Sequence, residues 1–193
     1  MRHLSIVIIL YLFTSCSWKE YSDEKYVIGK NYRDLISTYK AGDTLTFEDN
    51  SNNFSSFLIT KIDSFLLNRR GHFINGREEK SISIHSRDIS NPADSSAQND
   101  NWLILITKYP DDDTTYFNVR LKDFFTIEDN ASFNLYKDTV TANRLQFTSY
   151  YRFRPKDYDD LKNPNSVSEI YITKEKGIIA YKYLNGKWWT RFN

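Results

Sequence analysis

Turn signals between alternating segments are the feature of this sequence that most restricts its fold. The clearest is Asn185-Gly186, which separates residues 178–184 from residues 187–192. Asn and Gly best tolerate the positive φ angles of a type I′ turn, and this turn joins neighbouring antiparallel strands. A second Asn-Gly pair, at residues 75–76, precedes an alternating segment at residues 80–86. These dipeptides therefore predict β-hairpins.

Apolar and polar side chains alternate with a period of two along most of the chain. Residues 102–109 differ, because their first five side chains are apolar on both sides, as expected of a strand that is covered on both faces. Ten or so short strands joined mostly by tight turns predict an all-β domain, mainly an antiparallel meander, as a barrel, a half-barrel or a sandwich. The expected strands are residues 44–48, 54–62, 72–74, 80–86, 102–109, 115–121, 132–136, 145–153, 168–173, 178–184 and 187–192.

Two segments depart from this alternation. Residues 31–42 favour one short N-terminal helix, although an irregular segment is the alternative. Gly42 is placed to end that helix, whose apolar face would carry Tyr32, Leu35, Ile36 and Tyr39. Residues 88–101 are too poor in apolar side chains to pack, so they predict one long polar loop.

Composition agrees with β structure and excludes one class of partner. The 193 residues include 14 Tyr and 13 Phe but only 6 Gly and 1 Met, and aromatic side chains favour a pleated, half-buried surface. With 26 basic and 25 acidic side chains, the formal net charge is +1. A nearly neutral chain gives no reason to expect nucleic acid as a partner.

The first 16 residues have the pattern of an export signal. Arg2 supplies a positive charge, residues 4–13 form an apolar run, and the small residues Thr14 and Ser15 lead to Cys16, the one cysteine of the sequence. This is the arrangement of a secretory signal sequence. A membrane-spanning helix needs roughly 20 apolar residues, so we expect this shorter run to be removed.

Residues 13–16, Phe-Thr-Ser-Cys, resemble the lipobox of bacterial lipoproteins, in which the cysteine becomes the acylated first residue of the mature chain. Phe13 departs from the usual leucine at the first lipobox position. The resemblance implies a signal peptide at residues 1–15, a lipidated Cys16 that carries palmitate-type chains, a tether at residues 16–25 and a single β-rich domain at residues 26–193. Two or three acyl chains anchor a protein durably to a membrane. A plain secretory signal with cleavage nearby is the alternative.

Residues 41–47 (AGDTLTF) and 175–189 (EKGIIAYKYLNGKWW) resemble segments of small, uncharacterised lipoproteins of the Bacteroidota. The resemblance implies a cell-envelope location, at the outer membrane, with the periplasmic and the surface face left open. It also implies a β fold, but it carries no activity with it.

Signatures of catalysis and of metal binding are weak. After the signal, the chain has only His72 and His85, and neither has a Cys or His at metal-ligand spacing. We therefore expect no catalytic residue, no metal and no cofactor. The aspartates of residues 111–113 and 157–160 have the chemistry for the carboxylate pair of a hydrolase or for calcium ligands, although solvated turns explain them as well.

Aromatic residues near the C-terminus are the candidate ligand-binding group. Trp188 and Trp189 are adjacent in a predicted strand, so their side chains should point to opposite faces. One ring should be buried, and the other should face outward or line a cavity, where it would stack on a sugar or contact a partner. The candidates are Trp188, Trp189, Tyr181 and Tyr183, with packing alone as the alternative.

Three threonines each follow an aspartate, in a pattern that resembles the O-glycosylation acceptor of Bacteroidota envelope proteins. The resemblance implies Thr44, Thr114 and Thr139 as candidate modification sites. So short a pattern also arises by chance in a chain rich in Asp, Ser and Thr.

These observations predict a membrane-anchored lipoprotein of the cell envelope without enzymatic activity. Its N-terminal lipid would hold it at the membrane, and its β domain would bind a protein, a glycan or an apolar ligand. The alternative is a carboxylate-dependent hydrolase of the envelope.

Overall fold

The computed structural model describes residues 27–68, 78–90, 100–109, 114–128, 134–143, 145–155, 158 and 161–192. The export signal with Cys16 lies outside these ranges, and so do His72, the Asn-Gly pair at residues 75–76 and the aspartates of residues 111–113. Most of the polar loop predicted at residues 88–101 lies outside them as well.

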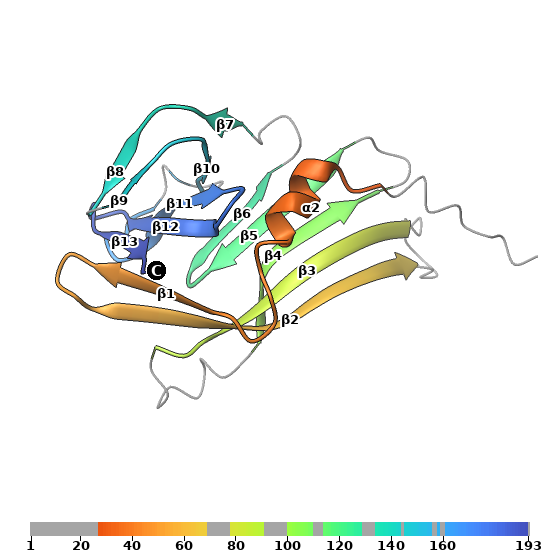
Figure 1. Ribbon diagram of the computed structural model, residues 1–193, viewed down its shortest axis with the longest axis horizontal. Coiled ribbons are helices and arrows are strands. Elements are labelled where there is room, and N and C mark those ends of the chain that lie inside the picture. The colour runs from red at the N-terminus through yellow and green to blue at the C-terminus, as the bar shows by residue number, and fades with distance from the viewer. Residues whose placement is uncertain are drawn as a thin grey trace, which may run out of the picture.

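One antiparallel sheet of eleven strands curls into a half-barrel and forms most of the described protein (Figure 1). The all-β prediction, with a half-barrel among its forms, is therefore confirmed. The strands are β1 (Thr44–Asp49), β2 (Phe54–Asn68), β3 (Glu78–Asp88), β4 (Asn101–Lys108), β5 (Thr115–Leu121), β6 (Phe124–Glu128), β7 (Leu135–Tyr136), β8 (Val140–Ala142), β9 (Leu145–Phe147), β10 (Tyr150–Phe153), β11 (Val167–Thr173), β12 (Gly177–Tyr183) and β13 (Trp188–Arg191). The sheet order is β6-β5-β4-β3-β2-β1-β13-β12-β11-β10-β7, and β8 and β9 form a separate hairpin.

The prediction of one strand over residues 145–153 is wrong, because β9 and β10 are separate strands. Ser149 lies between them with a φ angle of 54°. This angle belongs to the left-handed region, which cannot continue an extended strand. Strand β6 was not predicted at all, although it pairs with β5 and stands at one end of the strand order.

The predicted helix is present but shorter than the pattern indicates. Helix α2 (Lys30–Ile36) buries Tyr32 and Leu35 and ends six residues before Gly42. Tyr39 follows the helix, and its hydroxyl accepts a hydrogen bond of 2.8 Å from the backbone N–H of Ile178. Gly177 has a φ angle of 70°, and a Cβ atom at this position would overlap the Tyr39 hydroxyl. A glycine at position 177 therefore lets the end of the helix segment dock on β12.

The main core lies between α2 and the face of the sheet that the helix covers, which we call the inner face. Phe117 of β5 stacks against Tyr32 of the helix, with ring centroids 6.1 Å apart, and against Phe153 of β10, at 5.2 Å. Strands far apart in the sheet order therefore share one core. Leu35, Phe47 and other members of this cluster are completely buried.

A second, smaller core lies on the opposite face of the sheet, which we call the outer face. The β8–β9 hairpin supplies Ala142 and Phe147 to it, and the sheet supplies the buried Tyr150, Tyr171 and Ile179. Phe147 packs against the rings of Tyr150 and Tyr171 at 5.4 and 5.6 Å. The hairpin thus covers the outer face of the C-terminal strands.

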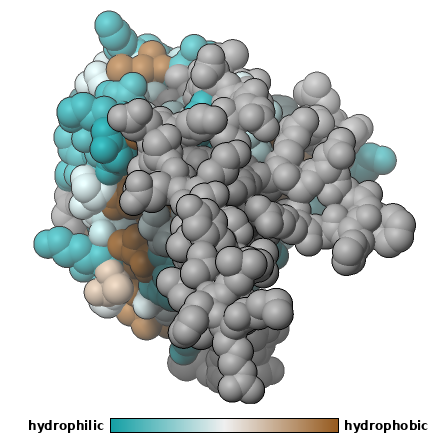
Figure 2. Space-filling model, turned by 90° about the vertical axis from the view of Figure 1, so that its right-hand side faces the viewer, coloured by the Kyte–Doolittle hydropathy of each residue, from teal (hydrophilic) through white to brown (hydrophobic). Residues whose placement is uncertain are grey.

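Exposed apolar side chains are spread over several elements. Figure 2 shows small hydrophobic areas separated by hydrophilic ones on the coloured part of one side of the molecule. The large apolar side chains with substantial exposure are Val27, Phe54, Ile89, Phe125, Ile127, Leu135 and Phe192. None of the described residues belongs to a helix long and apolar enough to cross a membrane.

Candidate functional site

The adjacent tryptophans of β13 lie on opposite faces of the sheet, as the strand alternation predicts. Trp189 lies in the main core with 8% of its surface exposed, and it stacks on Tyr181 with ring centroids 5.8 Å apart and planes at 8°. Trp188 lies half-buried at the edge of the outer core, 5.0 Å from the Tyr171 ring. Whether either ring binds a ligand stays a prediction.

The candidate tyrosines lie on β12 beside Trp189. The rings of Tyr181 and Tyr183 meet edge to face at 5.9 Å. Burial raises the pKa of Tyr183 to about 12 and raises the pKa of Tyr181 further above its usual range. Both phenols are therefore protonated at neutral pH.

Lys122 reaches these rings from the turn between β5 and β6. Its ammonium nitrogen lies 5.9, 5.9 and 5.5 Å from the ring centroids of Phe57, Tyr181 and Trp189. Burial lowers the pKa of this ammonium, while the nearby carboxylates of Asp88 and Asp123 act in the opposite direction. An ammonium above aromatic faces gains about 0.5–2 kcal/mol per contact, depending on its desolvation.

The backbone at Lys122 is unusual for a lysine. Its φ angle is 56°, and a side chain in the left-handed region costs roughly 1–2 kcal/mol. Asp123, the next residue, accepts a hydrogen bond of 3.2 Å from the backbone N–H of Val167. The β5–β6 turn is therefore attached to the start of β11, and the aromatic contacts of Lys122 offset its backbone strain.

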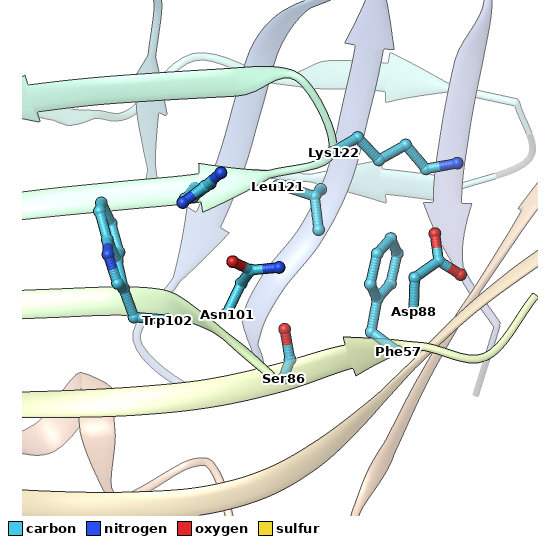
Figure 3. A pocket seen from close by; sticks show the side chains of 8 residues that line it. Phe57, Ser86, Asp88, Asn101, Trp102, Leu121 and Lys122 are labelled. Carbon is cyan, nitrogen blue, oxygen red and sulfur yellow. The ribbon is translucent and has the colours of Figure 1, made fainter. Parts of the chain in front are cut away.

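A pocket of about 100 Å³ opens beside this turn, where several strands of the sheet begin or end. A shallower hollow of about 390 Å³ shares Trp102, Arg120 and Lys122 with it, and we call the two together the rim pocket. Figure 3 shows how side chains from β2, β3, β4 and β5 converge on the smaller part. The smaller part is lined by Phe57, Ser86, Asp88, Asn101, Trp102, Arg120, Leu121 and Lys122, and the shallower part adds Asp123, Phe124 and Phe125.

Two aromatic rings flank the rim pocket beside a free positive charge. Trp102 and Phe125 meet edge to face at 5.6 Å, and Phe125 is 47% exposed. Arg120 is paired in register with Phe125, its side chain is exposed, and it forms no ion pair with any residue in the described ranges.

The carboxylates beside the rim pocket are already engaged. Asp88 Oδ1 accepts hydrogen bonds from the backbone N–H and the hydroxyl of Ser90, at 2.9 and 2.5 Å. Asp123 Oδ1 accepts the Val167 N–H at 3.2 Å. These donors are neutral, so both carboxylates keep their charge. The cations that line the pocket are Arg120, which forms no ion pair with any described residue, and Lys122, whose ammonium lies against aromatic rings.

No family model, curated protein or solved structure matches this chain. A functional proposal must therefore rest on the structure itself, and the rim pocket is its basis. Sequence patterns did not identify Trp102, Arg120, Lys122 or Phe125 as pocket residues. The one local feature that marks this region in the sequence is Lys122-Asp123, a charged pair between two apolar segments.

The remaining candidates are not brought together in the described part of the protein. His85 is half-buried on β3, with its Nε2 atom 3.0 Å from the Ser83 hydroxyl. The aspartates proposed for a hydrolase, at residues 111–113, 157, 159 and 160, lie outside the described residues. Among the residues that are described, no three His, Cys, Asp or Glu side chains gather closely enough to hold a metal ion.

The candidate glycosylation sites differ in accessibility. Thr44 is exposed at the start of β1, Thr139 is exposed just before β8, and Thr114 is half-buried before β5. Modification at any of the three stays a prediction.

Proposed function

We propose that this protein is a lipid-anchored, non-enzymatic protein of the cell envelope whose β domain binds an acidic glycan at the rim pocket. The observation that carries the proposal is the unpaired Arg120 guanidinium beside the aromatic pair of Trp102 and Phe125. A sugar ring stacks on an aromatic face, and a guanidinium binds a carboxylate through two parallel hydrogen bonds.

The anchor rests on the sequence of residues 1–16. The apolar run is too short to span a membrane, and the lipobox resemblance makes Cys16 the acylated residue. The outer membrane is the proposed location, with the tether of residues 16–25 between the lipid and the β domain.

A glycan suits the rim pocket better than an apolar ligand does. The shallow hollow measures about 390 Å³, within the range of roughly 300–1,000 Å³ that is usual for small-ligand pockets. Its lining combines aromatic rings with hydrogen-bonding side chains such as Ser86 and Asn101. The inner face itself is filled by completely buried side chains such as Phe47 and Phe117, which disfavours an apolar ligand between α2 and the sheet.

Anchoring is tested by labelling growing cells with a palmitate analogue that carries an alkyne. We expect the wild-type chain to take up the label and Cys16→Ser to lose it completely, because the thiol is the acyl acceptor. Equal labelling of the two chains would contradict the anchor, and it would leave the binding proposal open.

Binding is tested with the full-length protein in detergent micelles, by titration with oligogalacturonate and with the same oligosaccharide after methyl esterification. We expect saturable binding of the acid form and about tenfold weaker binding of the ester, because charge-assisted hydrogen bonds contribute about 1.5–3 kcal/mol. Arg120→Ala should weaken binding of the acid by a similar factor.

Arg33→Ala is the matched control, because Arg33 is an exposed arginine on α2 outside the rim pocket. It should bind the acid oligosaccharide as the wild type does. Equal binding of acid and ester would remove the role of Arg120, and no binding of either would remove the proposed function.

A further inference from the structure

A second hollow, of about 410 Å³, lies between the β1–β2 turn, β13 and the β8–β9 hairpin. We call it the outer groove. It shares no residue with the rim pocket, so the proposal that follows is independent of the one above. The side chains that matter for it are Asn50, Asn52, Asn143, Thr190 and Phe192.

The β1–β2 turn presents its amides from a rigid backbone. Asp49 Oδ1 accepts hydrogen bonds from the backbone N–H groups of Ser51 and Asn53, at 2.7 and 2.9 Å. Asp49 Oδ2 accepts the side-chain amide of Asn53 at 2.8 Å and pairs with Lys187 at 2.5 Å. Four groups are thus fixed around one buried carboxylate, and a turn held in this way loses little entropy when it binds a ligand.

The amides of Asn50 and Asn52 project from this turn without partners. Asn52 has a φ angle of 58°, which costs free energy even though asparagine tolerates it better than most residues. No described residue hydrogen-bonds to the side-chain amide of Asn50 or Asn52, and both residues are exposed. Four N–H donors and two acceptor oxygens of neutral amides are therefore available in the groove.

The opposite wall is formed by Asn143 in the β8–β9 turn. Its Nδ2 atom donates to the Glu48 carbonyl at 3.1 Å and to the Thr190 hydroxyl at 3.2 Å. These contacts fix the orientation of the Asn143 amide. If its oxygen and nitrogen were exchanged, the oxygen would face the carbonyl oxygen of Glu48, and two acceptors would meet. The Oδ1 atom is consequently left buried with no hydrogen-bond partner in the described structure. Since this oxygen has almost no accessible surface, the exposed amides of Asn50 and Asn52 are the ones that a ligand in the groove would contact.

An aromatic platform stands at the end of the groove. Phe192 is 55% exposed and Phe54 is 52% exposed, and their rings meet edge to face at 5.7 Å. The backbone N–H of Phe192 donates to the Thr46 carbonyl at 2.8 Å, which fixes the backbone at the base of this ring. Exposed rings of this kind offer an apolar face for a flat, partly apolar ligand.

The formal charges around the groove balance. Its lining includes the carboxylates of Glu48 and Asp49 and the guanidinium of Arg191. Lys187 pairs with Asp49, and Arg191 donates to the carbonyl of Lys176. We propose that the outer groove binds a neutral saccharide, whose hydroxyl groups bond to the asparagine amides and whose ring lies against Phe192.

The test is calorimetric titration of the full-length protein in detergent micelles with maltohexaose, cellohexaose and mannohexaose. At least one of the three should bind saturably. Phe192→Ala should weaken that binding about tenfold and Asn52→Gly about fivefold, as expected for the loss of a stacked ring and of one hydrogen-bonding amide. Asn52→Gly is informative because glycine favours the positive φ angle, so weaker binding cannot be attributed to an unfolded turn.

Two matched variants control for changes in stability and surface. Ser149→Gly changes another exposed residue with a positive φ angle, and Ile127→Ala shortens another exposed apolar side chain. Both should bind the saccharide as the wild type does. Absence of saturable binding for all three saccharides would overturn the proposal, and so would binding that Phe192→Ala and Asn52→Gly leave unchanged.

Discussion

Trp188 and Trp189 are neighbours in β13, but the regions around them are held together by different forces. Around Trp189 the contacts are mainly between rings, with Tyr181 stacked at 5.8 Å. Lys122 and Lys187 approach the Trp189 ring at 5.5 and 5.2 Å. The indole N–H is buried without a hydrogen-bond partner among the described residues. Stability in this region therefore comes mainly from removing apolar surface from water.

Around Trp188 the buried tyrosines are hydrogen-bonded to carboxylates, in two separate groups. Tyr171 donates its hydroxyl to Glu169, and Glu169 also pairs with Arg154 at 2.6 Å. Tyr150 donates to Asp138 at 2.9 Å, and burial, together with this carboxylate, raises the pKa of Tyr150 to about 12. The outer region thus combines a small aromatic core with hydrogen bonds to carboxylates, and we expect it to tolerate loss of a ring better.

Replacement of the two tryptophans should show this difference most strongly. Trp189→Ala should lower the free energy of unfolding by about 3–5 kcal/mol, as is typical for a large ring removed from a core. Trp188→Ala should cost roughly half as much, because its ring is only half-buried. Urea unfolding followed by far-ultraviolet circular dichroism measures both values. Equal losses would contradict the assignment of the two rings to different environments.

Replacement of Asp49 tests how much a buried charge on the inner face contributes to stability. Asp49 of β1 is paired with Trp189 of β13 in the strand register. Although burial acts to raise its pKa, Lys187 and the donors of Asn53 and Ser51 lower the pKa well below the usual range. A carboxylate whose folded-state pKa is depressed stabilises the protein above its unfolded-state pKa of about 3.9, and this stabilisation is lost as the pH falls towards the folded-state pKa.

Asp49→Asn should therefore destabilise the protein by about 2 kcal/mol at pH 7, the scale of hydrogen bonds to a charged group. The difference between wild type and variant should shrink as the pH is lowered from 4 to 2. Thermal unfolding at several pH values measures this, with Asp34→Asn on the exposed i,i+4 pair of α2 as the control. A constant difference over the whole range would show that the negative charge is not what stabilises the turn.

Much of the fold follows from local sequence patterns. Alternation and turn residues predicted an all-β antiparallel domain, and the same alternation placed Trp188 and Trp189 on opposite faces. The break at Ser149 was missed because Thr148-Ser149 carries no Gly, Asn or Pro to announce a turn. Strand β6 was missed because Phe124 and Phe125 are both apolar and hide the alternation.

The candidate sites were harder to predict because they depend on register between strands. Trp102, Arg120 and Phe125 lie on the neighbouring strands β4, β5 and β6, and their alignment follows from the pairing of these strands, which no local pattern reveals. The cover over Trp188 is likewise a long-range contact, since it comes from the β8–β9 hairpin. The sequence predicted that aromatic side chains gather near the C-terminus, but it did not predict which aromatic rings border a pocket.

Glycine substitutions at Lys122 and Ser149 should change the free energy of unfolding least. Comparing them measures the contribution of the aromatic contacts of Lys122 most directly. The two residues have nearly equal φ angles, 56° and 54°, so glycine relieves similar strain at both. Relief of the backbone strain stabilises the folded state by roughly 1–2 kcal/mol. The greater freedom of glycine in the unfolded chain costs about 0.4–1 kcal/mol, so a small net gain in stability remains. Ser149→Gly should therefore stabilise the protein by about 0.5 kcal/mol, because its exposed side chain has no contact to lose.

Lys122→Gly should instead destabilise by about 1 kcal/mol, since the loss of ammonium contacts with three rings exceeds the relief of strain. Lys122→Met keeps most of the apolar stem and removes the charge, so it separates packing from the cation contact. Midpoints of urea unfolding resolve differences of this size between variants. Lys122→Gly could instead prove as stabilising as Ser149→Gly. The contacts of Lys122 with Phe57, Tyr181 and Trp189 would then contribute nothing to the stability of the β5–β6 turn, and this wall of the rim pocket would not be held in place by them.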